Sequence, residues 1–203
     1  PLPIYMYLLY SFLLTLVAVL LLPYFLFQAL RNQKYFNNFV ERLGKYSSAF
    51  GSEGSPAIWI HAVSVGETLS ALPLIDMLRE NFPDHRIIVS TTTATGQAVA
   101  RSRVRNADAF LYFPFDWRFC VRRALRAVKP SLIVLMESEL WPNFLSECEH
   151  QKIPVIVANG RVSERAFRRS SKFRFFYSGM TARISRFLMQ TSGDAERIKA
   201  LGA

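Results

Sequence analysis

From residue 57 onward, short apolar runs alternate with longer segments whose apolar residues recur at helical spacing. The runs are rich in β-branched and bulky residues, as is typical of buried strands. They lie at residues 57–63, 86–92, 109–113, 132–136, 154–158 and 187–190. The other segments predict helices at residues 67–81, 96–104, 117–128, 142–151, 163–182 and 194–201. This alternation predicts an α/β fold in which helices cover both faces of a parallel sheet.

The six predicted strands suggest a Rossmann-like sheet in the order 3-2-1-4-5-6. In that order the first and fourth strands are neighbours, and the chain winds away from them in opposite senses. Open α/β sheets bind their ligands at this switch point, outside the carboxyl ends of the strands. We therefore look for functional residues in the loops that follow the strands.

The beginning of the chain has a different pattern. No charged side chain occurs between Ile4 and Leu30, and about twenty apolar residues suffice to span a bilayer as a helix. Basic residues follow this run, and such a flank predicts that the remainder is cytoplasmic. The pattern leaves open whether the segment spans the bilayer or lies along one leaflet, with a kink at Pro23. We expect a membrane anchor at residues 1–31, a polar connector at 32–56 and one Rossmann-like domain at 57–203.

Charge is unevenly spread along this chain of 203 residues, whose formal net charge is +10. Residues 101–129 hold eight Arg and Lys against two Asp, and residues 161–186 hold eight against one Glu. Behind a membrane anchor, such an excess suits anionic lipid headgroups or phosphorylated ligands. Nucleic acid would suit the charge equally well but would explain neither the anchor nor the acidic loops described below.

The cysteines and histidines do not form a metal-binding pattern. Cys120 and Cys148 have neither the close pairing nor the histidine partners of a zinc site, so we expect two reduced thiols in a cytosolic setting. The three histidines are scattered, and we expect no metal centre. The chain also has no glycine-rich dinucleotide fingerprint after the first strand, no Walker loop and no Gly-x-Ser-x-Gly turn. These absences argue against a dehydrogenase, a nucleoside triphosphatase and an esterase.

Glu67 is the principal candidate, because it opens the helix that follows the first strand. Ser64-Val-Gly66-Glu67 matches a capping box, in which the serine caps the helix and the glutamate reaches back to a free backbone N–H. Glu137 and Glu139 follow the fourth strand, which is the neighbour of the first in the predicted order. Capping accounts for one acid but not for three around one switch point, so the cluster favours a functional site.

Two further loops are expected at the same edge of the sheet. Residues 91–96, Thr-Thr-Thr-Ala-Thr95-Gly96, offer hydroxyls and backbone N–H groups at a helix start. They suit an anion, although ordinary threonine capping explains them equally well. Asn159-Gly-Arg161 follows the fifth strand and places a guanidinium beside the acids, for a phosphate or as a salt-bridge partner. Residues 113–116, Phe-Pro-Phe-Asp116, are better explained as a turn.

Four of these segments, together with the apolar beginning, resemble the lipid A Kdo transferases, which transfer 3-deoxy-D-manno-octulosonic acid in Gram-negative bacteria. They are His61-Ala-Val-Ser-Val-Gly-Glu67, Thr91-Thr-Thr-Ala-Thr-Gly96, Glu137-Ser-Glu-Leu-Trp-Pro-Asn143 and Asn159-Gly-Arg-Val-Ser163. The resemblance implies an inverting glycosyltransferase of the GT-B type, with two Rossmann-like domains facing a cleft. It also implies Kdo transfer from CMP-Kdo to a lipid A precursor at the cytoplasmic face of the bacterial inner membrane, with no cofactor.

Carried onto this sequence, the resemblance makes Glu67 the general base and Glu137 the residue that stabilises the transition state. The substrate-binding residues that it suggests are Ser64, Gly66, Thr95, Gly96, Glu139, Asn159 and Arg161. The chain corresponds to the first, acceptor-binding domain, and the donor-binding domain lies outside these residues. We therefore expect the isolated chain to be inactive. The alternative is a membrane-anchored module without catalysis that binds an anionic lipid or a nucleotide.

Overall fold

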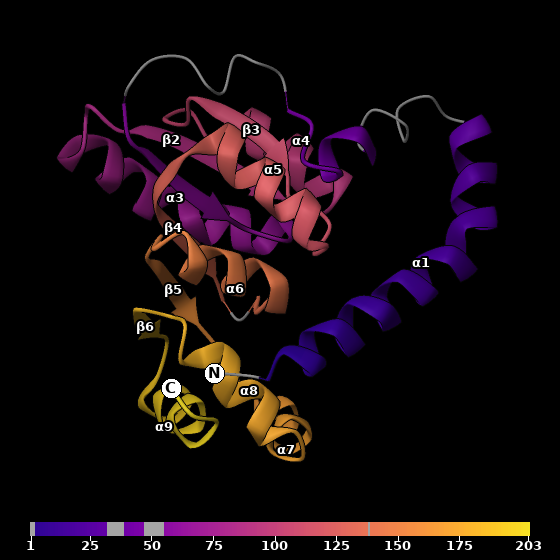
Figure 1. Cartoon of the computed structure of the whole chain (residues 1–203). Coiled ribbons are helices and arrows are strands. Elements are labelled where there is room, and N and C mark those ends of the chain that lie inside the picture. The colour runs from indigo at the N-terminus through magenta and orange to yellow at the C-terminus, as the bar shows by residue number, and fades with distance from the viewer. Residues whose placement is uncertain (1–2, 32–38, 47–54, 138) are drawn as a thin grey trace.

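The computed structural model describes residues 3–31, 39–46, 55–137 and 139–203. The N-terminal helix α1 (Ile4–Arg31) runs beside an α/β domain and continues through Pro23 (Figure 1). By length and composition its stretch Tyr5–Tyr24 could cross a membrane, and none of that stretch is buried in the protein. The first part of α1 contacts the domain, whereas its last turns extend away from it.

The domain is built on one parallel sheet, as predicted. Its strands are β1 (Ala57–His61), β2 (Arg86–Thr91), β3 (Ala109–Tyr112), β4 (Pro130–Met136), β5 (Val155–Gly160) and β6 (Arg186–Met189). The order is β3-β2-β1-β4-β5-β6, with every pair parallel, which confirms the predicted Rossmann-like topology. All five residues of β1 are buried, because this strand lies between β2 and β4 under helices on both faces.

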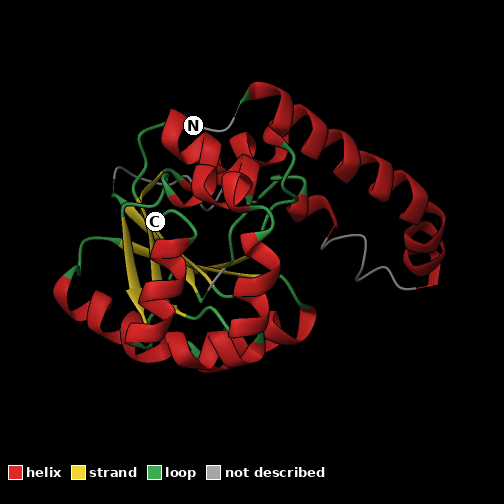
Figure 2. Ribbon diagram, turned by 90° about the horizontal axis from the view of Figure 1, so that it is seen from below, coloured by secondary structure: helices red, strands yellow, loops and turns green. Residues whose placement is uncertain are grey.

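Helices cover both faces of the sheet (Figure 2). They are α3 (Val65–Asn81), α4 (Ala94–Arg103), α5 (Arg118–Val128), α6 (Pro142–His150), α7 (Glu164–Ser171), α8 (Arg174–Thr181) and α9 (Ser192–Ala200). One face packs against α3 and α4, and its core contains Ile60 and Ile75. The other face packs against α5, α6 and α8 around Trp59 and Phe144, and residues of α1 join this second core.

One predicted element is wrong. Residues 163–182 form two helices, α7 and α8, and not the single helix that the pattern suggested. At the break, Lys172 and Phe173 donate to carbonyls three residues earlier, which tightens the last turn of α7. The break allows Phe167 on α7 to pack near Ile198 and Leu201, while Met180 on α8 joins the core of the sheet. A single straight helix could not pack against both of these apolar clusters.

Part of the expected connector covers an edge of the sheet. Residues 32–38 and 47–54 lie outside the described residues, but residues 39–46 pack against the edge strand β3. Glu41 accepts a hydrogen bond from the backbone N–H of Tyr112 at 3.2 Å, and the Tyr46 hydroxyl donates to the Tyr112 carbonyl at 2.9 Å. These bonds satisfy backbone groups that an uncovered edge would expose.

Candidate active site

Glu67 lies in the first turn of α3, directly after β1, and takes part in a reciprocal cap. The hydroxyl of Ser64 accepts the Glu67 backbone N–H at 3.3 Å and donates to Glu67 Oε1 at 2.9 Å. Glu67 Oε2 accepts the backbone N–H of Val63 at 2.8 Å. The capping prediction is therefore confirmed. A carboxylate has about four acceptor positions, so these two hydrogen bonds leave about two positions at which Glu67 can accept a further hydrogen bond.

Two further carboxylates lie near Glu67, as the sheet order predicted. Glu137 follows β4 directly, and Glu139 stands on the loop before Pro142, the first residue of α6. Burial and then the charge of Glu67 raise the pKa of Glu137. Burial raises the pKa of Glu139, and the charges of Glu67 and Glu137 add to this effect. Glu67, Glu137 and Glu139 are here called the acid cluster, because the charge of Glu67 acts on both of the other carboxyl groups.

The backbone around the acid cluster adopts conformations that most residues avoid. Glu137 has φ 58° and Asn159 has φ 54°, and both stand at the carboxyl ends of the adjacent strands β4 and β5. The left-handed region costs about 1–3 kcal/mol at a residue with a side chain, although asparagine tolerates it better than glutamate. Such conformations gather where function constrains the chain, so the backbone at Glu137 supports a role for its carboxylate.

Arg161 is a basic residue at this edge. It follows β5, its side chain is exposed, and its charge lowers the pKa of Glu137 against the effect of burial. The predicted position of a guanidinium beside the acids is thus observed. The carbonyl of Asn159 accepts a hydrogen bond from the side chain of Gln190 at 3.2 Å, which ties this loop to the end of β6.

The threonine loop after β2 joins the loop that precedes Glu67. Thr93 caps α4, and its hydroxyl accepts the backbone N–H of Gly96 at 3.0 Å. Thr93 also donates to the Val63 carbonyl at 3.4 Å, so the two loops are held together. The sequence offered two explanations for this loop, an anion site and threonine capping, and the structure shows the capping. Thr95 is exposed, and its hydroxyl lies 3.4 Å from the hydroxyl of Thr93.

The two glycines of these loops differ in what surrounds them. A methyl group at Gly96 would lie 2.8 Å from the Thr93 hydroxyl and 3.3 Å from the Val63 carbonyl. At Gly66, which is exposed, the nearest atom would be the Ser64 hydroxyl at 3.9 Å. Packing therefore explains the glycine at 96 but not the glycine at 66. The open position beside Glu67 is compatible with close approach of a ligand to the backbone.

Alanine at these two positions is expected to have opposite effects on stability. Gly66→Ala should stabilise the protein by about 0.4–1 kcal/mol, because the residue is helical and the methyl group meets open space. Gly96→Ala should destabilise it by about 1–3 kcal/mol, because a packed loop must shift. Urea unfolding of both variants measures the difference. If Gly66→Ala proved the more damaging, this description of the Glu67 loop would be wrong.

A buried polar cluster supports β1 behind this edge, and the sequence pattern gave no indication of it. His61 Nδ1 lies 2.9 Å from the Ser90 hydroxyl, and the imidazole stacks on Phe113 with ring centres 3.8 Å apart. Burial lowers the pKa of His61 to about 3, so the ring is neutral at physiological pH. A neutral, stacked histidine next to β2 is a structural element of the site and not a candidate base.

Asp116 also has a role that the sequence did not indicate. Its carboxylate accepts the backbone N–H groups of Asn143 at 3.0 Å and Phe144 at 2.7 Å, and thus caps the start of α6 from a distant loop. The interpretation of residues 113–116 as a turn is compatible with this contact. Because α6 begins three residues after Glu139, Asp116 fixes the end of the loop that carries two members of the acid cluster.

Within the part of the chain that the structure describes, no group of three or more His, Cys, Asp and Glu is arranged to hold a metal ion. Cys120 and Cys148 are free and buried. The groups that the structure brings together at this edge are carboxylates beside a guanidinium. A carboxylate can accept a proton, and a second one can offset developing positive charge.

Known proteins resemble this chain over most of its length. Residues 37–203 match the family described as 3-deoxy-D-manno-octulosonic-acid transferase (kdotransferase). The 3-deoxy-D-manno-octulosonic acid transferase of Haemophilus influenzae is 31% identical over 95% of this chain and 45% of its own length. The transferase of Chlamydia pneumoniae is 28% identical over 95% of this chain and 44% of its own.

A eukaryotic relative extends the comparison. The probable 3-deoxy-D-manno-octulosonic acid transferase of Arabidopsis thaliana, described as mitochondrial, is 34% identical over 83% of this chain and 37% of its own length. The chain thus spans less than half the length of these curated relatives. With the family match covering residues 37–203, this chain belongs to the 3-deoxy-D-manno-octulosonic acid transferase family and corresponds to its N-terminal region.

Proposed function

We propose that this chain is the acceptor-side half of an inverting glycosyltransferase that transfers Kdo from CMP-Kdo to a lipid A precursor. The observation that carries the proposal is the acid cluster at the switch point of the sheet, in a chain that belongs to this family. The second Rossmann-like domain of a GT-B enzyme would supply the site for CMP-Kdo.

In this mechanism Glu67 removes the proton from the acceptor hydroxyl as its oxygen attacks the anomeric carbon of Kdo. The bond between that carbon and the phosphate oxygen breaks, and CMP leaves with the electron pair. The transition state has oxocarbenium character, so the carboxylate of Glu137 offsets its positive charge. The electrostatic coupling of Glu67 to Glu137 supports the action of two carboxylates on one substrate.

The remaining residues of the edge are proposed to bind substrate. Gly66 offers an open backbone position, Thr95 an exposed hydroxyl, and Arg161 a cation for an anionic group. Asn159 stands near the end of β5 and Glu139 on the loop after β4, where Glu139 adds to the negative field around the acceptor hydroxyl. Ser64 and Gly96 act by holding the two loops in place, because their contacts are internal.

The contacts of α1 support attachment along one leaflet of the inner membrane, on its cytoplasmic face. Ser11 accepts a hydrogen bond from Asn143 at 3.1 Å, and Thr15 accepts one from Trp117 at 3.0 Å. These contacts fix one side of α1 to the domain, while apolar side chains on its other side are exposed. A helix docked in this way can insert its apolar side into a leaflet, whereas spanning would carry the docked domain surface into the hydrocarbon.

One observation favours the alternative, a module that binds an anionic lipid or nucleotide without catalysis. Both oxygens of Glu67 already accept hydrogen bonds, and only 7% of the residue is exposed. A base in this position must turn part of its carboxylate toward the acceptor when substrate binds. Catalytic hydrogen bonds are often made only in the substrate complex.

Product formation by the full-length protein distinguishes the two functions. The protein is incubated with CMP-Kdo and a lipid A precursor in detergent, and the lipid is analysed by mass spectrometry. The proposal expects a mass increase of one or more Kdo units, which disappears when CMP-Kdo is replaced by CMP. Binding of the lipid without any such product would support the non-catalytic module.

A further inference from the structure

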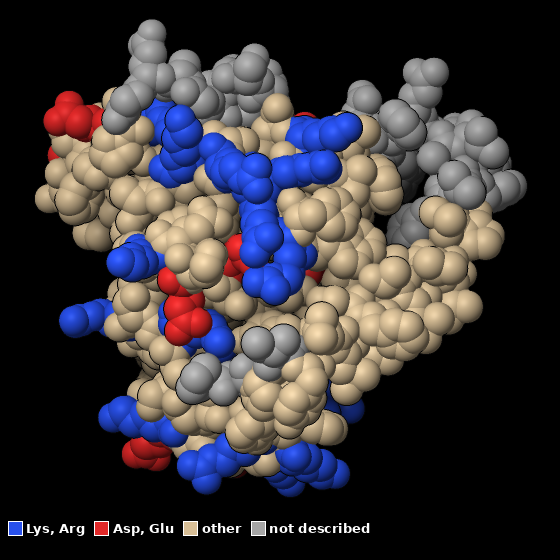
Figure 3. Space-filling model, viewed as in Figure 1, with Lys and Arg blue, Asp and Glu red and all other residues tan. Residues whose placement is uncertain are grey.

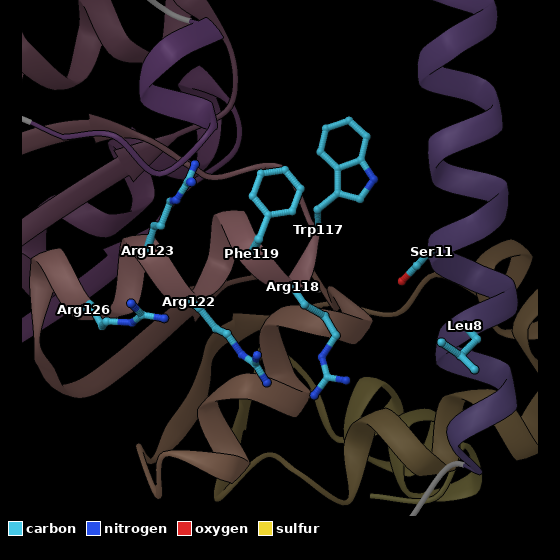
Figure 4. Close-up of a pocket in the computed structure, with 8 residues that line it drawn as sticks. All are labelled: Leu8, Ser11, Trp117, Arg118, Phe119, Arg122, Arg123 and Arg126. Carbon is cyan, nitrogen blue, oxygen red and sulfur yellow. The ribbon is translucent and has the colours of Figure 1, made fainter.

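A groove separates α1 from α5 and lies outside the acid cluster. Its volume is about 630 Å³, and it is lined by Leu8, Ser11, Trp117, Arg118, Phe119, Arg122, Arg123 and Arg126. Figure 4 shows the arginines along α5, with Leu8 and Ser11 across the groove on α1. Because α5 covers one face of the sheet and α3 the other, this groove is separate from the helix that carries Glu67.

The arginines form one cationic stripe because of their spacing. Arg118, Arg122 and Arg126 follow one another at intervals of four residues, which places them on one side of α5. The space-filling view shows basic side chains gathered over this part of the domain (Figure 3). Guanidinium groups form paired hydrogen bonds with phosphate oxygens, so the stripe suits a phosphorylated ligand.

A buried carboxylate orients two of these side chains. Glu147 on α6 is fully buried, and its oxygens each lie 2.8 Å from the Nε of Arg118 or Arg122. The side chains of Arg118 and Arg122 nevertheless remain 50% and 43% exposed. One carboxylate does not neutralise four arginines. The groove therefore keeps a net positive charge with two of its cations held in fixed directions.

The α1 side of the groove is lined by Leu8 and Ser11 and continues into the exposed apolar side of this helix. Leu8 belongs to a run of exposed apolar residues on this helix: Leu9, Phe12, Leu13, Leu16, Val17, Val19 and Leu20. Trp117 and Phe119 stack in parallel at the start of α5, with ring centres 6.1 Å apart, and Phe119 is exposed. Aromatic rings with such exposure are typical of membrane interfaces.

We infer that this groove binds the phosphate headgroup of an anionic phospholipid of the membrane, whose acyl chains lie along the exposed side of α1. The inference rests on the attachment of α1 to a leaflet, and it does not depend on Kdo transfer. The cationic stripe matches the headgroup, and the apolar side of α1 matches the chains. The ligand is thus a structural lipid that sets the depth and orientation of the domain at the membrane.

Arg123 and Arg126 are the residues to change, because they are exposed and do not contact Glu147. The test variant is Arg123→Gln with Arg126→Gln in the full-length protein. The matched control is Arg103→Gln with Arg105→Gln, which removes the same charge from exposed positions at the end of α4, a helix of the opposite face. Glutamine keeps helix propensity close to that of arginine, and thermal melts verify that both variants fold.

Binding is measured by flotation with vesicles of phosphatidylcholine, either alone or with about one part in three of phosphatidylglycerol. The wild-type protein should bind the mixed vesicles more tightly. The groove variant should lose about thirtyfold in affinity for them, since it lacks two basic residues that each contribute about 1 kcal/mol near an anionic surface, whereas the control should lose roughly twofold or less. Equal losses in both variants, or a wild-type protein without preference for phosphatidylglycerol, would overturn the inference.

These results are independent of those for Kdo transfer. If the protein transfers Kdo but the two double variants bind the mixed vesicles equally, only the inference of a lipid site in the groove is contradicted. If the protein binds phosphatidylglycerol through the groove but forms no product, only the proposed transferase function is contradicted. Failure to bind either vesicle would overturn the groove together with the attachment of α1 to the membrane.

Discussion

Glu67→Gln in the full-length protein is expected to lower the turnover rate of Kdo transfer by about 10²–10⁴-fold, the usual contribution of a general base. The amide cannot accept the proton of the acceptor hydroxyl, although it has nearly the shape of the carboxylate. KM for the acceptor should change little, because the base acts on the transition state. Steady-state transfer of Kdo from CMP-Kdo measures both quantities.

The stability of the same variant distinguishes a base from a cap. The glutamine oxygen can still accept the N–H of Val63, and its NH₂ group can donate to the hydroxyl of Ser64. Tm should therefore fall only slightly. A matched control exists at α9, where Thr191 and Asp194 form the same kind of cap and Asp194 also accepts the N–H of Val162 at 2.9 Å.

Asp194→Asn in this control should cost stability without removing a proton acceptor from the acid cluster. Hydrogen bonds, chiefly from Thr191 and Val162, lower the pKa of Asp194 to about 2, so its charged form is the one the fold stabilises. We expect Tm to fall while transfer well below Tm stays near that of the wild type. A Glu67→Gln variant that lost stability but kept full turnover would show that Glu67 is only a cap.

Asp116→Ala is expected to cost more stability than Gly96→Ala. The carboxylate is almost fully buried and accepts two backbone N–H groups at the start of α6. The variant leaves these two buried N–H groups without an acceptor, at a cost of about 1–3 kcal/mol each, so the loss of stability should be about 3 kcal/mol. For a protein of this size, that corresponds to a fall in Tm of roughly 6–12 °C. Differential scanning calorimetry measures it.

The loss of stability in Asp116→Ala should depend on pH in a defined direction. Burial raises the pKa of Asp116 to about 7, although the N–H groups of Asn143 and Phe144 lower it. A carboxyl group whose pKa is higher in the folded protein contributes most below its ordinary pKa of about 4, and this contribution is lost as pH rises through the folded value. The difference in Tm between wild type and variant should thus be larger at about pH 5 than at about pH 8.

An exposed aspartate provides the control for this experiment. Asp84 lies in the turn before β2 and is exposed, so Asp84→Ala should change stability by about 0.5 kcal/mol or less. If Asp116→Ala were equally harmless, the start of α6 would not depend on the loop after β3. The fixed position of Glu139 would then need another explanation.

The strand order and the acid cluster could be predicted because both follow from local patterns and one topological rule. Apolar runs located the strands, and the alternation with helices gave a parallel sheet whose first and fourth strands are neighbours. That rule predicts that Glu67 and Glu137 lie near each other, although the two are far apart in sequence. The capping of α3 by Ser64 was predictable for the same reason, since a capping box involves only adjacent residues.

The division of residues 163–182 could not be predicted, because apolar spacing continues across the break. Only the packing of Phe167 and Met180 against different clusters requires two helices there. The caps from Asp116 and the orientation of Arg118 and Arg122 by Glu147 were missed for a related reason. Each joins residues from separate helices or loops, and no local spacing marks such partners.

The sequence by itself determined the α/β class, the order of the sheet, the apolar helix at the start and the residues that gather at the switch point. These properties depend on the period of apolar residues and on short motifs, and both involve residues that are close together in the sequence. Only the tertiary structure decided how α1 lies against the domain and where the arginines of α5 point. These features depend on side chains that meet across long separations, so their geometry exists only after the core has packed.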